Sequence, residues 1–472
     1  MMINRPGESR DISRSTYLII FFTALFLRLA YCFYLQKFMW GSFKYVDDDT
    51  PTYLNSFMNL IHYGRYCFDL AIKDSCFYRL PTYPFFLGIN YLLFGKFAWV
   101  SVSVLQSIID AVSCCLAFAI TRSLNTDLIA QRIVALLFVF YPFTLVWTPI
   151  QYPEIIGVFL VLLAVYLIID KNMVLAVLGG GAALVLGVWS KQYIIALLPF
   201  VVFLVAARPD PKKIIAMSVA IYLSFAVLYS PWPVRNYVNH GEWAPLMGKT
   251  TGCRHHLSDF NSAAGFVALF YENPKDALDV IVADGMLTLP QSKFVYAHRS
   301  EIDRAARLAF ESGPSFKTWR HEAVEINEES IRSEKKVADA FVSLSAKAKS
   351  ELGFMEYYRT GVEGFQKGFF KTTYTAKGGS SLIQSLLFGY RGILVVLGIL
   401  AIFIAQGRVR WFVVGVLLYW FSTLLVLSFI HRHVEMRYLL MSDMLLIICS
   451  GLTIGWLLDN VRMVMMHKGN KA

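Results

Sequence analysis

A series of apolar segments, each long enough to cross a membrane as a helix, constrains the fold of this chain more than any other feature. Crossing a hydrocarbon layer of about 30 Å takes about 20 residues at about 1.5 Å per residue. Residues 17–35, 98–121 and 438–458 are segments of this kind. Only 16% of the 472 residues are charged, against about 25% in soluble domains, and the mean hydropathy is +0.51. The sequence therefore predicts an all-α integral membrane protein.

We expect about ten transmembrane helices in two groups. They cover residues 17–35, 98–121, 173–189, 192–207, 386–405, 411–430 and 438–458, with three more that end near residues 147, 170 and 229. Residues 83–95 are apolar but too short to cross, which indicates a re-entrant or interfacial segment. Three parts follow: an N-terminal transmembrane module of about seven spans with an acidic first extracytoplasmic loop (1–230), an extracytoplasmic, mainly helical soluble domain (231–385), and a C-terminal transmembrane module of about three spans with a basic cytoplasmic tail (386–472).

Lys and Arg residues concentrate in alternate connections between these segments. They occupy the N-terminus, the turns at residues 122–132, 171, 208–213 and 408–410, and the C-terminal tail. Short basic connections stay in the cytoplasm, so the other connections face outward. The net charge of +11 is then a topology signal, and we expect no nucleic-acid partner. The chain has no Asn-x-Ser/Thr sequon, so nothing indicates an N-glycosylated lumenal face. We expect a bacterial inner (plasma) membrane, with the outward side facing the periplasm.

Two cysteines, Cys67 and Cys76, share the first predicted outward loop. An extracytoplasmic compartment is oxidising, so the two thiols can form a disulfide bond there, but they can also stay reduced. The sequence leaves both states open.

The same loop carries three consecutive carboxylates, Asp47, Asp48 and Asp49. Thr50, followed by proline, is suited to cap a helix that Gly64 can end. A helix N-terminus favours negative charge, so we expect Asp49 to stay ionised just outside the membrane, as the base of a glycosyl transfer requires. The alternative is a capped loop whose acids are simply solvated.

Other ionisable residues gather on the same predicted outward side. They are Arg79, Glu154, Lys191, Arg235 and Arg437. Ionisable groups at the membrane margin usually face a protein cavity or a pathway. Carboxylates mixed with Arg and Lys indicate a substrate with a hydroxyl to deprotonate and a phosphate to hold. The alternative for the cations is that they only reach from span ends into water.

Six short motifs occur in order along this side. They are Asp49-Thr-Pro-Thr-Tyr53, Tyr78-Arg-Leu-Pro-Thr-Tyr-Pro84, Tyr152-Pro-Glu154, Ser190-Lys191-Gln192, Pro231-Trp-Pro-Val-Arg-Asn236 and Glu435-Met-Arg437-Tyr438. In this order they resemble motifs of the dolichyl-phosphate-mannose-protein mannosyltransferase-like family of GT-C membrane glycosyltransferases, which includes bacterial aminoarabinose transferase relatives. Two departures are that Lys191-Gln192 replaces the usual Arg-Pro and that no proline follows Glu154.

The resemblance implies a GT-C-like bundle that moves a sugar from a polyprenyl-phosphate donor to a glycan, lipid or protein acceptor, in contact with membrane lipids. It implies an inverting single displacement with Asp49 or Asp48 as the general base. Glu154 would orient the acceptor, share the proton or bind a metal ion. The donor phosphate would be held by Arg79, Lys191, Arg235 and Arg437.

No cofactor is certain from the sequence, and a divalent metal ion stays open. His431 and His433 are the candidate ligands, but nothing in the sequence fixes a third ligand.

Two other classes of function also stay open. A secondary transporter or lipid flippase would use the charged residues as its pathway, but internal duplication is not apparent and the charges are expected outside the middle of the membrane. A non-catalytic subunit of envelope assembly would use residues 231–385 to bind a partner. Turnover of a polyprenyl-phosphate sugar would separate the enzyme from both.

The predicted topology places residues 231–385 outside the cytoplasm, which cysteine labelling can test. We expect Ser330→Cys to react with a membrane-impermeant thiol reagent in intact cells, whereas Arg410→Cys, in a basic turn, should react only after lysis. Labelling of Ser330→Cys only after lysis would contradict the topology and would indicate that residues 173–207 form one helix.

Overall fold

The computed structural model describes the chain from residue 14 to residue 469 with short gaps. The described residues are 14–47, 49–70, 75–124, 126–210, 213–246, 258–271, 274–320, 322–325, 327–369, 381–430 and 434–469. Every regular element within these ranges is a helix. The predicted all-α class is therefore confirmed for the described part of the chain.

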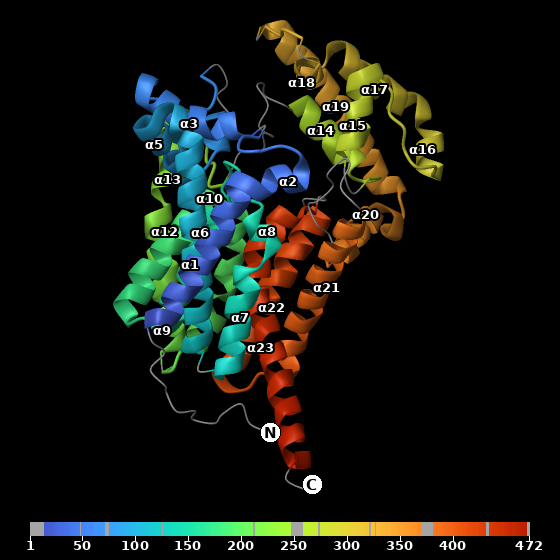
Figure 1. Cartoon of the computed structure of the whole chain (residues 1–472). Helices are drawn as coiled ribbons and strands as arrows, with labels where there is room; N and C mark the ends of the chain where they lie inside the picture. The colour runs from blue at the N-terminus through green and yellow to red at the C-terminus, as the bar shows by residue number, and fades with distance from the viewer. Residues whose placement is uncertain are drawn as a thin grey trace.

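The N-terminal half consists of helices that pack side by side in a bundle (Figure 1). They are α1 (Arg14–Ala30), η1 (Tyr31–Leu35), α2 (Gln36–Trp40), α3 (Thr50–Tyr63), α4 (Ser75–Tyr78), α5 (Thr82–Phe94), η2 (Gly95–Phe97), α6 (Ala98–Ser123), α7 (Leu128–Val139), α8 (Pro142–Leu145), α9 (Glu154–Asp170), η3 (Leu175–Gly179), α10 (Gly180–Ser190), η4 (Gln192–Phe200), α11 (Val201–Ala206), α12 (Ile214–Tyr229) and α13 (Pro231–His240).

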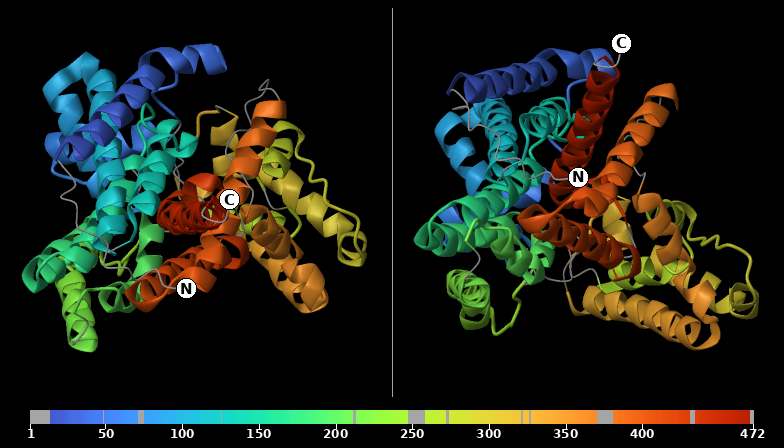
Figure 2. Two further views of the ribbon diagram at one scale, coloured as in Figure 1. Left: turned by 60° about the horizontal axis from the view of Figure 1, so that its bottom comes forward. Right: turned by 90° about the horizontal axis from the view of Figure 1, so that it is seen from below.

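A second group of helices, with a core of its own, follows in the chain. It comprises α14 (Ser258–Val267), α15 (Lys275–Asp284), α16 (Lys293–Ala297), α17 (Arg299–Ser312), α18 (Pro314–Trp319) and α19 (Glu328–Glu351), and α20 (Phe354–Gly368) links it to α21 (Ser381–Ile404), α22 (Gly407–Leu425), η5 (Val426–Ile430) and α23 (Met436–Gly469). Phe266, Ile302 and Phe341 lie in the core of α14–α19. These helices lie at the end of the bundle where α3 lies, with α20 between them and α21, and α23 ends at the opposite end (Figures 1 and 2). Which side of the membrane this end faces, and the boundaries at residues 230 and 385, stay predictions.

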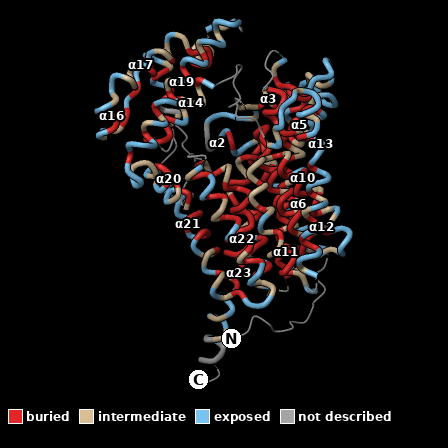
Figure 3. Tube along the Cα trace, turned by 180° about the vertical axis from the view of Figure 1, so that it is seen from behind, coloured by how far each residue is buried: buried red, intermediate tan, exposed pale blue. Residues whose placement is uncertain are grey.

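Seven helical stretches of the described residues are long and apolar enough to cross a membrane. They are Arg14–Phe38, Thr82–Ser123, Leu128–Leu145, Ile214–His240, Ser385–Ile404, Gly407–Ile430 and Met436–Met463. Their buried faces form a continuous core along the bundle (Figure 3). These stretches identify the chain as an integral membrane protein.

The expected number of about ten crossings is not confirmed, because three expected spans fall on shorter helices. α9 has 17 residues, which span ~26 Å against a layer of about 30 Å. The apolar stretches Leu175–Ser190 and Gln192–Ala206 are shorter still. Each of these two begins with an irregular piece, the π-helical η3 and the 3-10 helical η4, so neither forms one long α-helix.

The 42-residue stretch Thr82–Ser123 is a hairpin. Gly95 has φ +51°, a conformation that glycine adopts without strain. On either side of it, Tyr83 Oη donates to Gln106 Oε1 at 3.1 Å, and Ser101 Oγ donates to Asn90 Oδ1 at 2.6 Å. α5 therefore folds back along the first turns of α6 and is too short to cross alone, as the sequence predicted for residues 83–95.

Two ion pairs lie buried between membrane helices. Arg28 of α1 pairs with Asp110 of α6 at 2.8 Å and also donates to the carbonyl of Phe138 in α7. Arg391 of α21 pairs with Asp443 of α23 at 2.9 Å. Neither pair was predicted from the sequence, from which charges were expected outside the middle of the membrane.

Ser330, the position proposed above for cysteine labelling, takes part in the capping of α19. The side chain of Asn327 accepts hydrogen bonds from the backbone of Glu329 and Ser330, and the Ser330 hydroxyl accepts one from the backbone of Asn327. Replacing Ser330 removes half of this capping box. Exposed Glu329 is therefore a better labelling position than Ser330.

Asp259 of α14 is a buried acid in the core of this second group. Its Oδ1 accepts from the hydroxyl of Ser315 at 2.5 Å and its Oδ2 from the backbone N–H of Ser315 at 3.1 Å. Burial raises the pKa of Asp259 to about 6, and these hydrogen bonds oppose the rise only in part. The folded state thus binds this proton more tightly than the unfolded state, whose Asp pKa is about 3.9.

We expect this acid to make α14–α19 less stable as pH rises from about 4 to about 7, by roughly 2 to 3 kcal/mol in the free energy of unfolding. The contribution of protonated Asp259 to the free energy of unfolding is complete below the pKa of the unfolded state and is lost as pH rises through about 6. Asp259→Asn imitates the protonated form and should flatten this pH dependence. Amide hydrogen exchange of α14 and α18 between pH 5 and 8 measures it. Asp303→Asn, at a partly exposed ion pair with Arg299, is the control, and equal pH slopes in both variants would contradict the prediction.

Candidate active site

Asp49 lies immediately before α3. It is the N-cap residue, yet its carboxylate makes no capping hydrogen bond. The carboxylate Oδ1 instead pairs with Arg79 Nη2 at 2.8 Å. Helix α3 begins at Thr50 and ends before Gly64, whose φ is +69°. Gly64 thus ends the helix as predicted, whereas the expectation that Thr50 is the cap is wrong, because the helix already starts at that residue.

Arg79 is held in place on several sides. Its Nε donates to Thr52 Oγ1 at 2.8 Å, and that hydroxyl donates to the carbonyl of Asp49 at 2.7 Å. The guanidinium lies over the rings of Tyr53, 4.0 Å from the centroid, and Tyr78, 4.5 Å from the centroid. An arginine sandwiched in this way is weakly hydrated and keeps its charge when buried.

The charges around Asp49 keep it ionised. Burial opposes ionisation, but Arg79, Arg437 and Lys191 outweigh it and hold the pKa of Asp49 below its usual value. The carboxylate is still 33% exposed, so a substrate hydroxyl can reach it. The site thus contains an ionised, accessible base at the end of a helix.

A second ion pair lies at the same end of the bundle. Glu154, the first residue of α9, pairs with Lys191, which follows α10, at 2.7 Å. The hydroxyl of Ser190 donates to the carbonyl of Pro153 at 3.2 Å and ties the two turns together. The Glu154 side chain is fully buried and its Oε2 has no hydrogen-bond partner among the described residues. Burial lowers the pKa of Lys191, although Glu154 opposes this.

Tyrosine rings connect these pairs to Arg437 at the start of α23. Arg437 pairs with Glu435 and lies over the rings of Tyr438 and Tyr152, 5.0 and 5.7 Å from their centroids. The Tyr152 ring meets the Tyr53 ring edge-on at 6.3 Å. Arg437, Tyr152, Tyr53 and Arg79 therefore form a contiguous series of cations and rings.

Two hydrogen bonds hold the segment before α3 against the segment before α9. The N–H of Gln151 donates to the carbonyl of Tyr45 at 2.9 Å, and the Thr50 hydroxyl donates to the carbonyl of Gln151 at 3.3 Å. The segment with Asp49 is thereby held next to Tyr152 and Glu154, although the two segments are about 100 residues apart.

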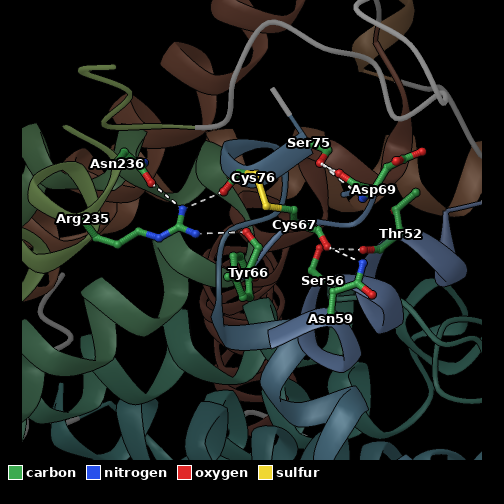
Figure 4. The surroundings of a disulfide bond; sticks show 10 residues. All are labelled: Thr52, Ser56, Asn59, Tyr66, Cys67, Asp69, Ser75, Cys76, Arg235 and Asn236. Carbon is green, nitrogen blue, oxygen red and sulfur yellow. Dashed lines mark hydrogen bonds between the residues drawn. A yellow bond between two sulfur atoms is a disulfide. The ribbon is translucent and has the colours of Figure 1, made fainter. Parts of the chain in front are cut away.

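Arg235 serves a different part of the structure (Figure 4). Its guanidinium donates to the carbonyls of Cys76 at 2.8 Å and Tyr66 at 3.0 Å and to Asn236 Oδ1 at 2.8 Å. Cys67 and Cys76 form a disulfide bond, which settles the alternative that the sequence left open. Arg235 thus holds the disulfide loop.

The structure brings together five of the predicted site residues, namely Asp49, Arg79, Glu154, Lys191 and Arg437. Asp48, His431 and His433 lie outside the described residues. Within the described ranges, no group of three or more His, Cys, Asp or Glu side chains is placed to hold a metal ion. The catalytic and phosphate-binding roles of the five residues stay predictions.

Sequence reasoning missed the tyrosines of the site. A single tyrosine in a sequence carries no sign of what it faces. A usable signal was present: Tyr53, Tyr78, Tyr152 and Tyr438 each lie within four residues of a predicted charged site residue.

No model of a known protein family matches the sequence, and no curated protein matches it. Among solved structures, the oligosaccharyltransferase of Archaeoglobus fulgidus in its apo form is similar over 98% of this chain, with a TM-score of 0.50 and 15% identity. The archaeal oligosaccharyltransferase AglB from Archaeoglobus fulgidus, in complex with an inhibitory peptide and a dolichol-phosphate, is similar over 96% of the chain, with a TM-score of 0.51 and 14% identity.

These similarities establish the fold, which is GT-C-like. Each covers 52% of the archaeal protein, so the chain spans about half the length of the protein it matches. Membership of the mannosyltransferase-like or aminoarabinose transferase families is not confirmed.

Proposed function

We propose that this protein is a membrane glycosyltransferase that moves a sugar from a polyprenyl-phosphate donor to an acceptor hydroxyl. The observation that carries the proposal is the ion pair of Asp49 with Arg79 at the start of α3, with Lys191 and Arg437 also acting on the carboxylate. The GT-C-like fold supports it, as does the dolichol-phosphate present in one similar structure. The transporter alternative gains no support from the fold.

The reaction is a single displacement. Asp49 accepts the proton of the acceptor hydroxyl while the hydroxyl oxygen bonds to the anomeric carbon. The bond from that carbon to the phosphate oxygen breaks on the opposite face, so the configuration inverts, and polyprenyl phosphate leaves with one more negative charge than the bound phosphodiester. Buried cations stabilise that charge more strongly than cations in water.

Arg79, Lys191 and Arg437 are the cations we assign to the donor phosphate. All three act on Asp49, so a phosphate among them lies near the base. Arg235 has a weaker claim, because its hydrogen bonds go to backbone carbonyls of the disulfide loop. Glu154, buried beside Lys191, orients the acceptor or takes the proton if Asp49 does not.

The motif resemblance supports the finer parts of the proposal. It favours a mannosyltransferase-like or aminoarabinose transferase-like enzyme of the bacterial inner membrane, with its site facing the periplasm. The acceptor is a glycan, a lipid or a protein. Comparison of envelope glycans by mass spectrometry with and without the protein identifies both the sugar and the acceptor.

Replacing the base tests the proposal. General-base catalysis contributes about 10²–10⁴-fold, so Asp49→Asn should lower turnover of a polyprenyl-phosphate sugar by that order with donor binding retained. Asp47→Asn is the control, because Asp47 pairs with the exposed ammonium of Lys44 and should keep nearly full activity. Normal turnover of Asp49→Asn would refute its role. If Asp48→Asn is then inactive, the base is the neighbouring residue; if Glu154→Gln is inactive, Glu154 is the base.

The acid limb of the pH–rate profile tests the partnership of Asp49 with Arg79. Because Arg79 is the largest of the charges that lower the pKa of Asp49, Arg79→Gln should raise that pKa. The base must be deprotonated, so the acid limb of kcat/KM should move to higher pH in Arg79→Gln and should move less in Arg79→Lys, which keeps the charge. An acid limb at the same pH in wild type and Arg79→Gln would show that Asp49 is not the titrating base.

A further inference from the structure

One side of α20 is apolar and exposed. Phe354 and Met355 are each 75% exposed, and Val362, two turns further along the same side, is 38% exposed. The adjoining side carries Arg359 and Glu363, whose side chains approach to 3.9 Å. Arg359 follows Met355 by four residues and marks the border between the apolar and the charged side. α20 is therefore amphipathic, and its apolar side is only partly covered by the described chain.

The remaining side of α20 packs on the last turns of a membrane-spanning helix. A Cβ atom on Gly361 would lie 2.6 Å from the ring of Phe429, and one on Gly368 would lie 2.1 Å from the side chain of Leu424. The ring of Tyr358 lies 6.2 Å from that of Phe429. α20 thus lies directly against α22 and η5, where the stretch Gly407–Ile430 ends.

Those last turns also present an exposed apolar face. Leu425, Val426 and Ile430 are exposed, and on a membrane-spanning helix such a face contacts lipid. Phe354 and Met355 add exposed apolar surface on α20, the helix that packs against these turns. Figure 1 shows α20 between the top of α21 and the helices α14–α19. The depth of α20 is therefore set by the end of a transmembrane span.

We infer that α20 lies in the membrane interface, with Phe354 and Met355 inserted among the lipid acyl chains and with Arg359 and Glu363 in water. Amphipathic helices bind at this depth through buried apolar area. The charges on its polar side are balanced, so anionic lipid is not required. The apolar side of α20 can therefore insert at the interface of a bilayer of any headgroup charge.

This contact is connected to the candidate active site. The carbonyl of Gly368, at the end of α20, accepts a hydrogen bond from Arg391 at 2.6 Å, and Arg391 pairs with Asp443 of α23. The first turn of α23 carries Arg437. The lipid contact therefore holds α14–α19 at a fixed height above the helix that supplies a site cation, independently of which reaction the site performs.

Spin labelling of the full-length protein in phosphatidylcholine nanodiscs tests the inference. Phe354→Cys and Met355→Cys report on the apolar side, and Glu363→Cys and Lys367→Cys are matched controls on the polar side of the same helix. Half-buried Cys115 is replaced by serine in all four variants. We expect nitroxides at Phe354 and Met355 to relax more with oxygen than with a water-soluble nickel chelate, and the controls to show the reverse.

Two results would overturn the inference. Equal access of the nickel chelate to all four positions would place α20 in water. Low access of both relaxants at Phe354 and Met355 would show that protein, such as a second copy of this chain, covers the apolar side. Because both residues are exposed, their replacement does not disturb the core, and the readout does not depend on turnover.

Discussion

The burial of charge between membrane helices is the constraint on which the packing of this protein depends. Lipid tails are as apolar as leucine, so apolar side chains alone do little to select which helices become neighbours. An unpaired charge in that environment is costly, so Arg28 requires α6 beside α1, and Arg391 requires α23 beside α21. Asp443 also accepts a hydrogen bond from Trp420 of α22 at 2.7 Å. Within the described ranges, each half of the bundle thus contains a buried ion pair that favours this arrangement of its helices.

The same constraint shapes the candidate site. Its cations are each paired with an acid: Arg79 with Asp49, Lys191 with Glu154, and Arg437 with Glu435. Pairing makes it possible to hold positive charge at the membrane margin before any phosphate arrives. The tyrosine rings between the pairs stabilise the guanidinium groups without supplying further negative charge. These charges are therefore close to electrical balance, and a substrate anion must compete with the paired acids for the cations.

The sequence predicts what depends on local pattern and fails where distant segments must meet. The lengths of the apolar segments predict the all-α membrane class, and the short segment 83–95 forms a helix of 13 residues, as its length led us to expect. Residues 173–207 were expected to give two full spans, but the irregular η3 and η4 depend on packing within the bundle. The buried partner of Arg28 is 82 residues away, and no local pattern identifies it. Arg235 matched a motif, yet its hydrogen bonds depend on the fold of the disulfide loop.

The pairing of Asp49 with Arg79 raises a question about base strength, because a carboxylate with a lowered pKa is a weaker proton acceptor. Under the proposed reaction, a donor phosphate bound by Arg79 competes with Asp49 for the same guanidinium. The pKa of Asp49 then rises towards its ordinary value, and its strength as a base increases only when donor is present. Without donor, the ion pair keeps Asp49 deprotonated and makes it a poor acceptor of a proton from water. An arginine shared between base and leaving group would thus couple donor binding to activation of the acceptor, and only its guanidinium would need to move.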